Sequence, residues 1–227
     1  MTMRIVGVDL GCLQDYTGIV SMAAAQPDGG GEPYWYIDYI CRPPLGTRYV
    51  DITALLRDYA ASTPVDIIAV DATGVGTAVV EILRAVNLGR IVPITITGGA
   101  ETTVKNGGYH VPKQEIIGTL QAVVEQRLLK VKKSLPLGKT LVSEMHNFRV
   151  KYRPTASVEL SAWRERDHDD LVLACAIAVW TGERFRLRSQ SPIIFHRVSA
   201  PPLKPMSARQ FVKLLSKEAY NGPKSLH

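Results

Sequence analysis

The chain has 227 residues, of which 46% are hydrophobic and 21% are charged. This composition allows a full hydrophobic core, and no apolar run approaches the roughly 18 residues of a membrane span, so a membrane-embedded protein is excluded. The three cysteines are widely separated and form no CxxC pair, which argues against a disulfide framework or a zinc site. Since no secretory signal is recognisable at the N-terminus, we expect a reducing, cytoplasmic location.

The positive charge is concentrated at the C-terminal end of the chain. Residues 1–183 hold 18 Lys and Arg against 20 Asp and Glu, whereas residues 184–227 hold 9 against 1. Such a segment suits an acidic partner such as nucleic acid, although a solvated or disordered tail has the same composition. We therefore expect a folded domain over residues 1–186 and a basic linker and tail over residues 187–227.

The first half of the chain predicts a sheet with a crossover unit. Strand patterns occupy residues 4–11, 18–25 and 34–41 and form adjacent antiparallel strands, followed by an amphipathic helix over 49–62. A buried strand over 65–71 then leads through Ala-Thr-Gly-Val-Gly into a helix over 77–86 and a strand over 90–96. A strand, a glycine turn, a helix and a second strand predict a parallel β-α-β unit.

The second half is expected to be mainly helical. The predicted elements are a loop over 98–112, helices over 113–129 and 141–148, a hairpin or strand over 152–163, and a helix over 171–180. The last helix is apolar nearly all round, which indicates that it is buried. A proline-containing linker over 189–205 and a short amphipathic segment over 207–220 follow. The element order predicts an α/β fold with a mixed β-sheet flanked by helices.

Carboxylates stand at three comparable places in this arrangement. Asp9 ends the first strand, Asp71 ends the first parallel strand, and Asp169 and Asp170 open the buried helix. Each alone is commonly a turn former or a helix cap. Together they would repel one another at one edge of the sheet unless a cation joined them.

Oxygen ligands without cysteine favour Mg²⁺ or Mn²⁺ over Zn²⁺. Two such ions can activate a water and stabilise the leaving oxygen of a phosphodiester. Asp9 would then anchor both ions, Asp71 would hold the second, and Asp170, or Asp169 in its place, would complete the first.

Four segments carry a family resemblance. They are GVDLG at 7–11, VDATGVGTAVVEILR at 70–84, VPKQEIIGTLQAVVEQRLLKV at 111–131 and HDDLVLACAIAVW at 168–180. In order and spacing they resemble the ribonuclease H-like nuclease domain of phage terminase large subunits. The resemblance implies an endonuclease that uses Mg²⁺ or Mn²⁺ to cut double-stranded, concatemeric phage DNA for packaging, in the cytoplasm of the host cell. It also implies that Asp9, Asp71 and the Asp169/Asp170 pair are the metal ligands.

Terminase large subunits also carry an ATPase motor, and this sequence contains no GxxxxGK[ST] phosphate loop. The resemblance therefore leaves open whether a separate packaging ATPase, a small terminase subunit or a portal is a partner. It also leaves open whether the task is packaging or another kind of DNA cutting.

Several basic residues are candidates for contact with DNA. Lys113 opens a predicted helix near the presumed DNA groove, where it could contact phosphate or simply be solvated. His168 precedes the aspartate pair, where it could position a water or a phosphate oxygen or act as a capping or packing histidine. Phosphate contacts are also expected from the arginines that follow the buried helix, Arg184, Arg186 and Arg188.

Three other functions fit parts of the sequence. A junction resolvase would use the same fold and the same carboxylates on branched DNA. An actin-like ATP-binding or kinase protein also begins with a strand ending in Asp-Leu-Gly, but it needs two such domains and leaves Asp169 and Asp170 without a role. A DNA-binding packaging module without catalytic activity is the third alternative.

Overall fold

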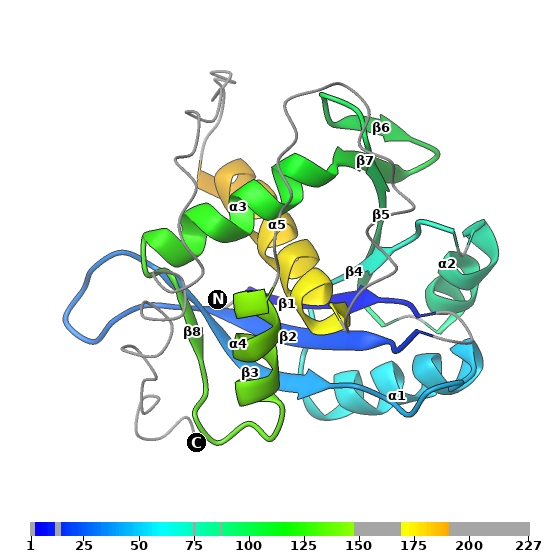
Figure 1. Cartoon of the computed structure of the whole chain (residues 1–227), viewed down its shortest axis with the longest axis horizontal. Coiled ribbons are helices and arrows are strands. Elements are labelled where there is room, and N and C mark those ends of the chain that lie inside the picture. The colour runs from blue at the N-terminus through cyan, green and yellow to red at the C-terminus, as the bar shows by residue number, and fades with distance from the viewer. Residues whose placement is uncertain (1–2, 12–14, 75, 87, 148–168, 191–227) are drawn as a thin grey trace.

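A mixed sheet of eight strands forms the centre of the structure, which is a computed structural model that describes residues 3–11, 15–74, 76–86, 88–147 and 169–190. Five helices cover the two faces of this sheet in the described part of the chain (Figure 1). The strand order is β6-β7-β5-β4-β1-β2-β3-β8. The predicted α/β architecture with a mixed sheet is therefore confirmed.

The strands of the first half begin and end close to the predicted residues. The antiparallel unit consists of β1 (Arg4–Asp9), β2 (Gly18–Ala25) and β3 (Tyr34–Cys41). On the other side of β1, β4 (Ile67–Asp71) and β5 (Arg90–Thr97) pair in parallel, as the crossover pattern predicted. The first strand is thus central, and its carboxyl end lies beside the carboxyl end of β4.

Helices cover both faces and divide the core in two. On one face lie α1 (Tyr49–Ser62) and α2 (Gly76–Ala85), packed on the side chains of β1 and β4 that point towards them. The other face carries α3 (Lys113–Glu125), α4 (Gly138–Asn147) and α5 (Asp170–Gln190) (Figure 1). No helix among the described residues is both long and apolar enough to span a membrane.

The buried position predicted for α5 is confirmed, and two of its small residues explain how close it comes to the sheet. A Cβ atom on Gly7 in β1 would lie 2.1 Å from the carbonyl oxygen of Ala174 and 2.9 Å from the Cβ atom of Ala178. Residues 171–182 are buried without interruption. The helix therefore lies directly on the central strands, with backbone against backbone.

Two predictions for the second half are wrong. Residues 98–112, expected as a loop, contain the hairpin of β6 (Thr103–Lys105) and β7 (Gly108–Pro112). Asn106 and Gly107 turn this hairpin with positive φ angles of 50° and 73°, which is the ordinary behaviour of an Asn-Gly turn and was present in the sequence.

The helix expected over 113–129 ends at Glu125, and Arg127 reverses the chain with a φ of 62°. The following residues form β8 (Leu129–Val131) beside β3, with Leu129 buried and the half-buried Lys130 over the ring of Tyr34.

The last helix is longer than predicted, and two expectations lie outside the described residues. Helix α5 continues to Gln190, across the expected boundary between residues 186 and 187 and into the expected linker. The hairpin or strand expected over 152–163 and the segment over 207–220 are not among the described residues. The division into a domain and a tail therefore stays a prediction.

Replacing Gly7 by alanine is expected to destabilise the fold by about 1–3 kcal/mol, because the new methyl group would push α5 away from β1. Thermal unfolding of the full chain measures this effect. Gly99→Ala is the matched control, since its Cβ atom would meet only the hydroxyl of Thr97 at 3.5 Å. Equal stability of the two variants would contradict the proposed close contact.

Candidate functional site

Two of the predicted carboxylates lie next to each other at the edge of the sheet. Strand β1 pairs in parallel with β4 up to Val8 opposite Val70, so Asp9 and Asp71 are the next residues of the two neighbouring strands. Asp71 is only 5% exposed. This placement agrees with the expectation from the sequence that the two residues lie at the carboxyl ends of neighbouring parallel strands.

A hydrogen-bonded turn orients Asp71. The backbone N–H of Thr73 donates to Asp71 Oδ1 over 2.7 Å, and the hydroxyl of Thr73 accepts the backbone N–H of Ile96 over 2.8 Å. The turn after β4 is thereby fixed to β5. One carboxylate oxygen of Asp71 is held in place by the backbone.

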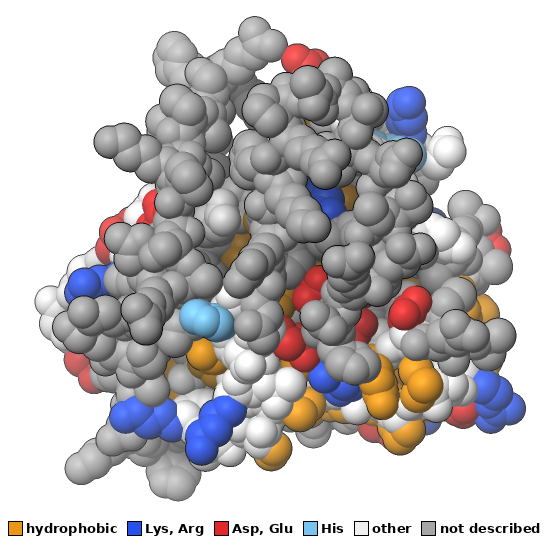
Figure 2. All heavy atoms as spheres, in the orientation of Figure 1, with side chains coloured by type: hydrophobic (Ala, Val, Ile, Leu, Met, Phe, Trp, Pro, Cys, Tyr) orange, Lys and Arg blue, Asp and Glu red, His pale blue; other side chains and the backbone are white. Residues whose placement is uncertain are grey.

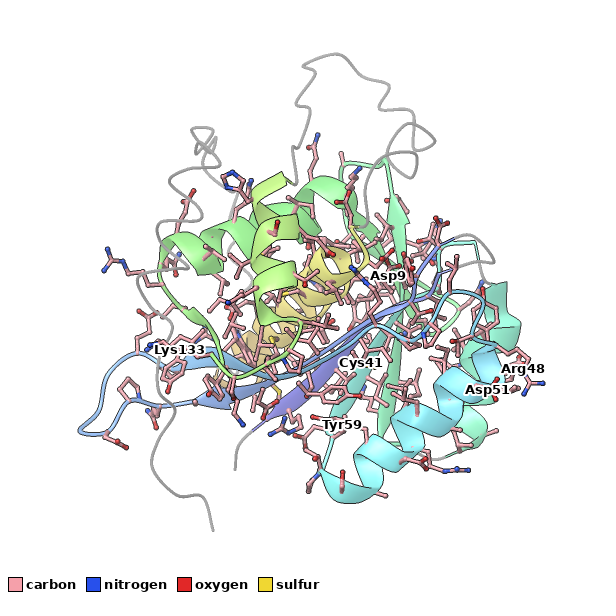
Figure 3. All side chains as sticks on the ribbon, turned by 60° about the horizontal axis from the view of Figure 1, so that its bottom comes forward. Asp9, Cys41, Arg48, Asp51, Tyr59 and Lys133 are labelled. Atoms are coloured by element: carbon pink, nitrogen blue, oxygen red, sulfur yellow. The ribbon has the colours of Figure 1, made fainter. Side chains whose placement is uncertain are left out.

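The start of α5 is pressed against the same region. Gly18 is the residue opposite Asp9 in the antiparallel β1–β2 ladder, and a Cβ atom on Gly18 would lie 2.3 Å from the carbonyl oxygen of Asp170. Asp170 therefore begins its helix beside the ladder position of Asp9, and Figure 3 shows Asp9 at this end of the sheet, far from Lys133.

The backbone distinguishes between the two adjacent aspartates. The carbonyl oxygen of Asp169 accepts the first hydrogen bond of α5, from Leu173 N–H over 2.9 Å, so Asp169 has the position of a helix cap. Asp170 stands in the first turn, where the helix dipole favours a negative charge. Its Oδ2 atom lies 3.5 Å from Arg42 Nη2.

Sequence reasoning missed Arg42 and Glu144. Arg42 follows β3, Glu144 lies on α4, and the two form an ion pair beside Asp170. The side chains of Arg42, Glu144 and Asp170 are 15%, 11% and 13% exposed, so the whole cluster is largely removed from water. No local motif marks Arg42 or Glu144, because only the packing of α4 on α5 brings them to the site.

Burial raises the pKa of Glu144, and the negative charge of Asp170 acts in the same direction, although the ion pair with Arg42 opposes the shift. Figure 2 shows acidic side chains gathered near the middle of this face, where α4 and the start of α5 meet the sheet, with basic side chains next to them. Carboxylates concentrated in this way favour a cation among them.

Lys113 belongs to the same electrostatic environment. It is the first residue of α3, after Pro112, and partial burial lowers its pKa to about 8, against the opposing effect of the negative charge on Asp169. The structure therefore places Lys113 within electrostatic reach of Asp169. Its expected contact with phosphate stays a prediction.

The other candidate residues are not brought together with the carboxylates. Arg184 lies over the rings of Tyr109 and Trp180, at 5.0 and 5.3 Å, and Arg186 pairs with Glu183 over 2.8 Å. Arg184 stands fourteen residues after Asp170 on α5, which is roughly 20 Å along the helix. His168 and the side chain of Arg188 lie outside what the structure describes. Roles of these residues in DNA binding remain predictions.

The carboxylates fit a hard cation in chemistry and in their place on the fold. Asp9, Asp71 and Asp170 offer oxygen atoms only, which suits Mg²⁺ or Mn²⁺. As the side chains are placed, however, the described residues contain no group of three or more His, Cys, Asp or Glu that could hold a metal ion. The backbone therefore places the three aspartates in one region of the sheet, but their carboxylate groups do not converge on a single position.

Solved structures with the same fold include phage terminases. The large terminase nuclease of the thermophilic phage G20c, solved with bound zinc, is 23% identical, with a TM-score of 0.52 over 78% of this chain and 80% of that chain. The HK97 bacteriophage large terminase is 13% identical, with a TM-score of 0.51 over 80% of this chain and 40% of that one. The chain has the ribonuclease H-like fold, and this prediction is confirmed.

The remaining comparisons add nothing to that assignment. RuvC of Thermus thermophilus covers 82% of this chain and 96% of its own at 11% identity, with a TM-score of 0.43 that is too low to support an argument. No protein-family model and no curated sequence matches the chain.

Thr73→Val is expected to destabilise the protein by about 1–3 kcal/mol, because the backbone N–H of Ile96 would lose its acceptor while remaining partly buried. Thr53→Val is the matched control. The hydroxyl of Thr53 is buried but only donates to the Tyr49 carbonyl one helical turn earlier, so its loss leaves no backbone donor unpaired. Urea unfolding of both variants measures the difference, and equal losses would contradict the role given to Thr73.

Proposed function

We propose that the chain is a metal-dependent endonuclease that hydrolyses double-stranded DNA. The observation that carries this proposal is the backbone placement of three aspartates: Asp9 and Asp71 follow neighbouring parallel strands, and Asp170 begins a buried helix against Gly18, the ladder partner of Asp9. The common fold with terminase nuclease structures supports it. Cutting of concatemeric phage DNA for packaging, with a separate ATPase, a small terminase subunit or a portal as partner, is the finer form of the proposal.

The three aspartates would have different roles in metal binding because they occupy different positions. Two Mg²⁺ or Mn²⁺ ions, when bound, would supply charge stabilisation at the phosphate and a more acidic water. Asp9 lies between Asp71 and the start of α5, so it is the residue suited to contact both ions. Asp71, held by the turn at Thr73, and Asp170, in the first turn of α5, would each contact one.

Basic groups would hold the substrate. Lys113 is close enough to the carboxylates to sense the charge of Asp169, and in this position it would bind a phosphate oxygen next to the bond that is cut. The six Lys and Arg residues between 191 and 227 would add contacts with the DNA backbone that are independent of base sequence.

Purified protein is expected to cut supercoiled plasmid DNA with Mn²⁺ or Mg²⁺ and to stop in EDTA. Asp9→Asn, Asp71→Asn and Asp170→Asn should each lower the cleavage rate a hundredfold or more, because each removes charge stabilisation worth several kcal/mol. Their melting temperatures in EDTA should be equal or higher, since like charges are relieved.

Asp169→Asn is the matched control beside Asp170→Asn, because asparagine also caps helices well. Cutting that resists EDTA, or full activity of Asp9→Asn, would end the proposal. A four-way DNA junction cut much faster than linear DNA of the same sequence would favour a junction resolvase.

Replacing the Lys and Arg residues between 191 and 227 by glutamine is expected to flatten the dependence of DNA affinity on salt. Each phosphate contact that is lost lowers the slope of log affinity against log salt by about 0.9. Fluorescence anisotropy with a short duplex between 50 and 200 mM salt measures this slope. An unchanged slope would assign the basic segment to another role, such as a protein partner.

A further inference from the structure

Arg42 connects three parts of the site that are far apart in sequence. It forms an ion pair with Glu144 on α4, its guanidinium lies 3.5 Å from Asp170 at the start of α5, and it stands 5.6 Å from the centre of the Tyr16 ring. Its Nε atom is buried and has no hydrogen-bond partner among the described residues. The charged partners of Arg42 among the described residues are the carboxylates of Glu144 and Asp170.

The two carboxylates do not share the arginine equally. Glu144 is within hydrogen-bonding distance, whereas the contact with Asp170 is a looser one at 3.5 Å. A guanidinium binds a carboxylate most strongly through two parallel hydrogen bonds, and such a pair would occupy both oxygens of Asp170. Glu144 competes for that arrangement, because it holds the same guanidinium more closely.

We propose that Arg42 is an internal counter-cation for the metal-free site and that Glu144 is a positioning residue that prevents Arg42 from closing on Asp170. This inference rests on the proposed function, since it takes Asp170 as a metal ligand. Without metal, Arg42 limits the repulsion between buried carboxylates. With Glu144 in place, Asp170 is not held by Arg42 through two parallel hydrogen bonds.

A merely structural ion pair between β3 and α4 predicts something different. Removing either partner of a buried pair leaves an uncompensated charge and lowers stability. If the pair is only structural, the Arg42 and Glu144 variants should both lose stability and should change Mn²⁺ affinity in the same direction or not at all. A counter-cation and its positioning residue should instead change metal affinity in opposite directions.

The test is Mn²⁺ binding to the full-length protein by titration calorimetry, with thermal unfolding in EDTA measured in parallel. Glu144→Gln should weaken Mn²⁺ binding at least about tenfold, because Arg42 is freed to pair with Asp170. Arg42→Gln should strengthen it by a similar factor, since a unit charge a few ångströms from the ligands acts at an effective dielectric constant near 20. The same variant should melt at a lower temperature in EDTA.

In the double variant Arg42→Gln with Glu144→Gln, the loss of affinity caused by Glu144→Gln should disappear, because Glu144 acts through Arg42, and Mn²⁺ should bind more tightly than to the original protein. This comparison keeps the test valid if Arg42→Gln alone does not fold. Arg57→Gln is the control, because Arg57 and its partner Asp58 are 57% and 72% exposed on α1. Its effect should be small, since solvent and salt screen the charge.

Opposite shifts in the two single variants, together with tighter binding in the double variant than in the original protein, support the inference. Weakening in both single variants overturns it, as does unchanged affinity in both or a double variant that binds like the original protein, and the proposed function then still stands. If the original protein binds no Mn²⁺, the proposed function itself fails and the inference fails with it.

Discussion

The close contact between α5 and the centre of the sheet is the constraint on which the rest of the site depends. Neither Gly7 nor Gly18 places a side chain between the strands and α5. Gly7 lies against Ala174 and Ala178, and Gly18 lies against the backbone of Asp170. Helix α5 can therefore begin directly beside the carboxyl end of β1. Larger side chains at Gly7 and Gly18 would push α5 away from the sheet, and Asp170 would then lie farther from Asp9 and Asp71.

This placement has an electrostatic cost that the surrounding residues reduce. Asp71 is almost fully buried, and Asp170 and Glu144 are largely so. Buried carboxylates near one another are unfavourable, and the cation of Arg42, together with the backbone N–H of Thr73 and the dipole of α5, offsets part of that cost. The site is thus arranged to tolerate negative charge while it remains attractive to cations.

Much of the architecture could be predicted because the signals were local. Two apolar strands and one apolar helix could be recognised along the sequence. Their ends coincide with Asp9, Asp71 and Asp170, so the positions of these acidic residues in the fold could be predicted. The hairpin at Asn106 and Gly107 was also predictable, because an Asn-Gly pair favours a tight turn between two strands. The ion pair of Arg42 and Glu144 was not predictable, since it depends on how α4 packs against α5 rather than on any pattern along the chain.

The sheet ends on both sides in strands of only three residues. All three residues of β6 are exposed, and β8 pairs with β3 at three positions only. A free edge of this length offers few unpaired backbone groups to another chain, so lateral addition of a second sheet would gain little hydrogen bonding. Among the described residues, the two outermost strands of the sheet therefore offer little template for edge-to-edge pairing with another chain.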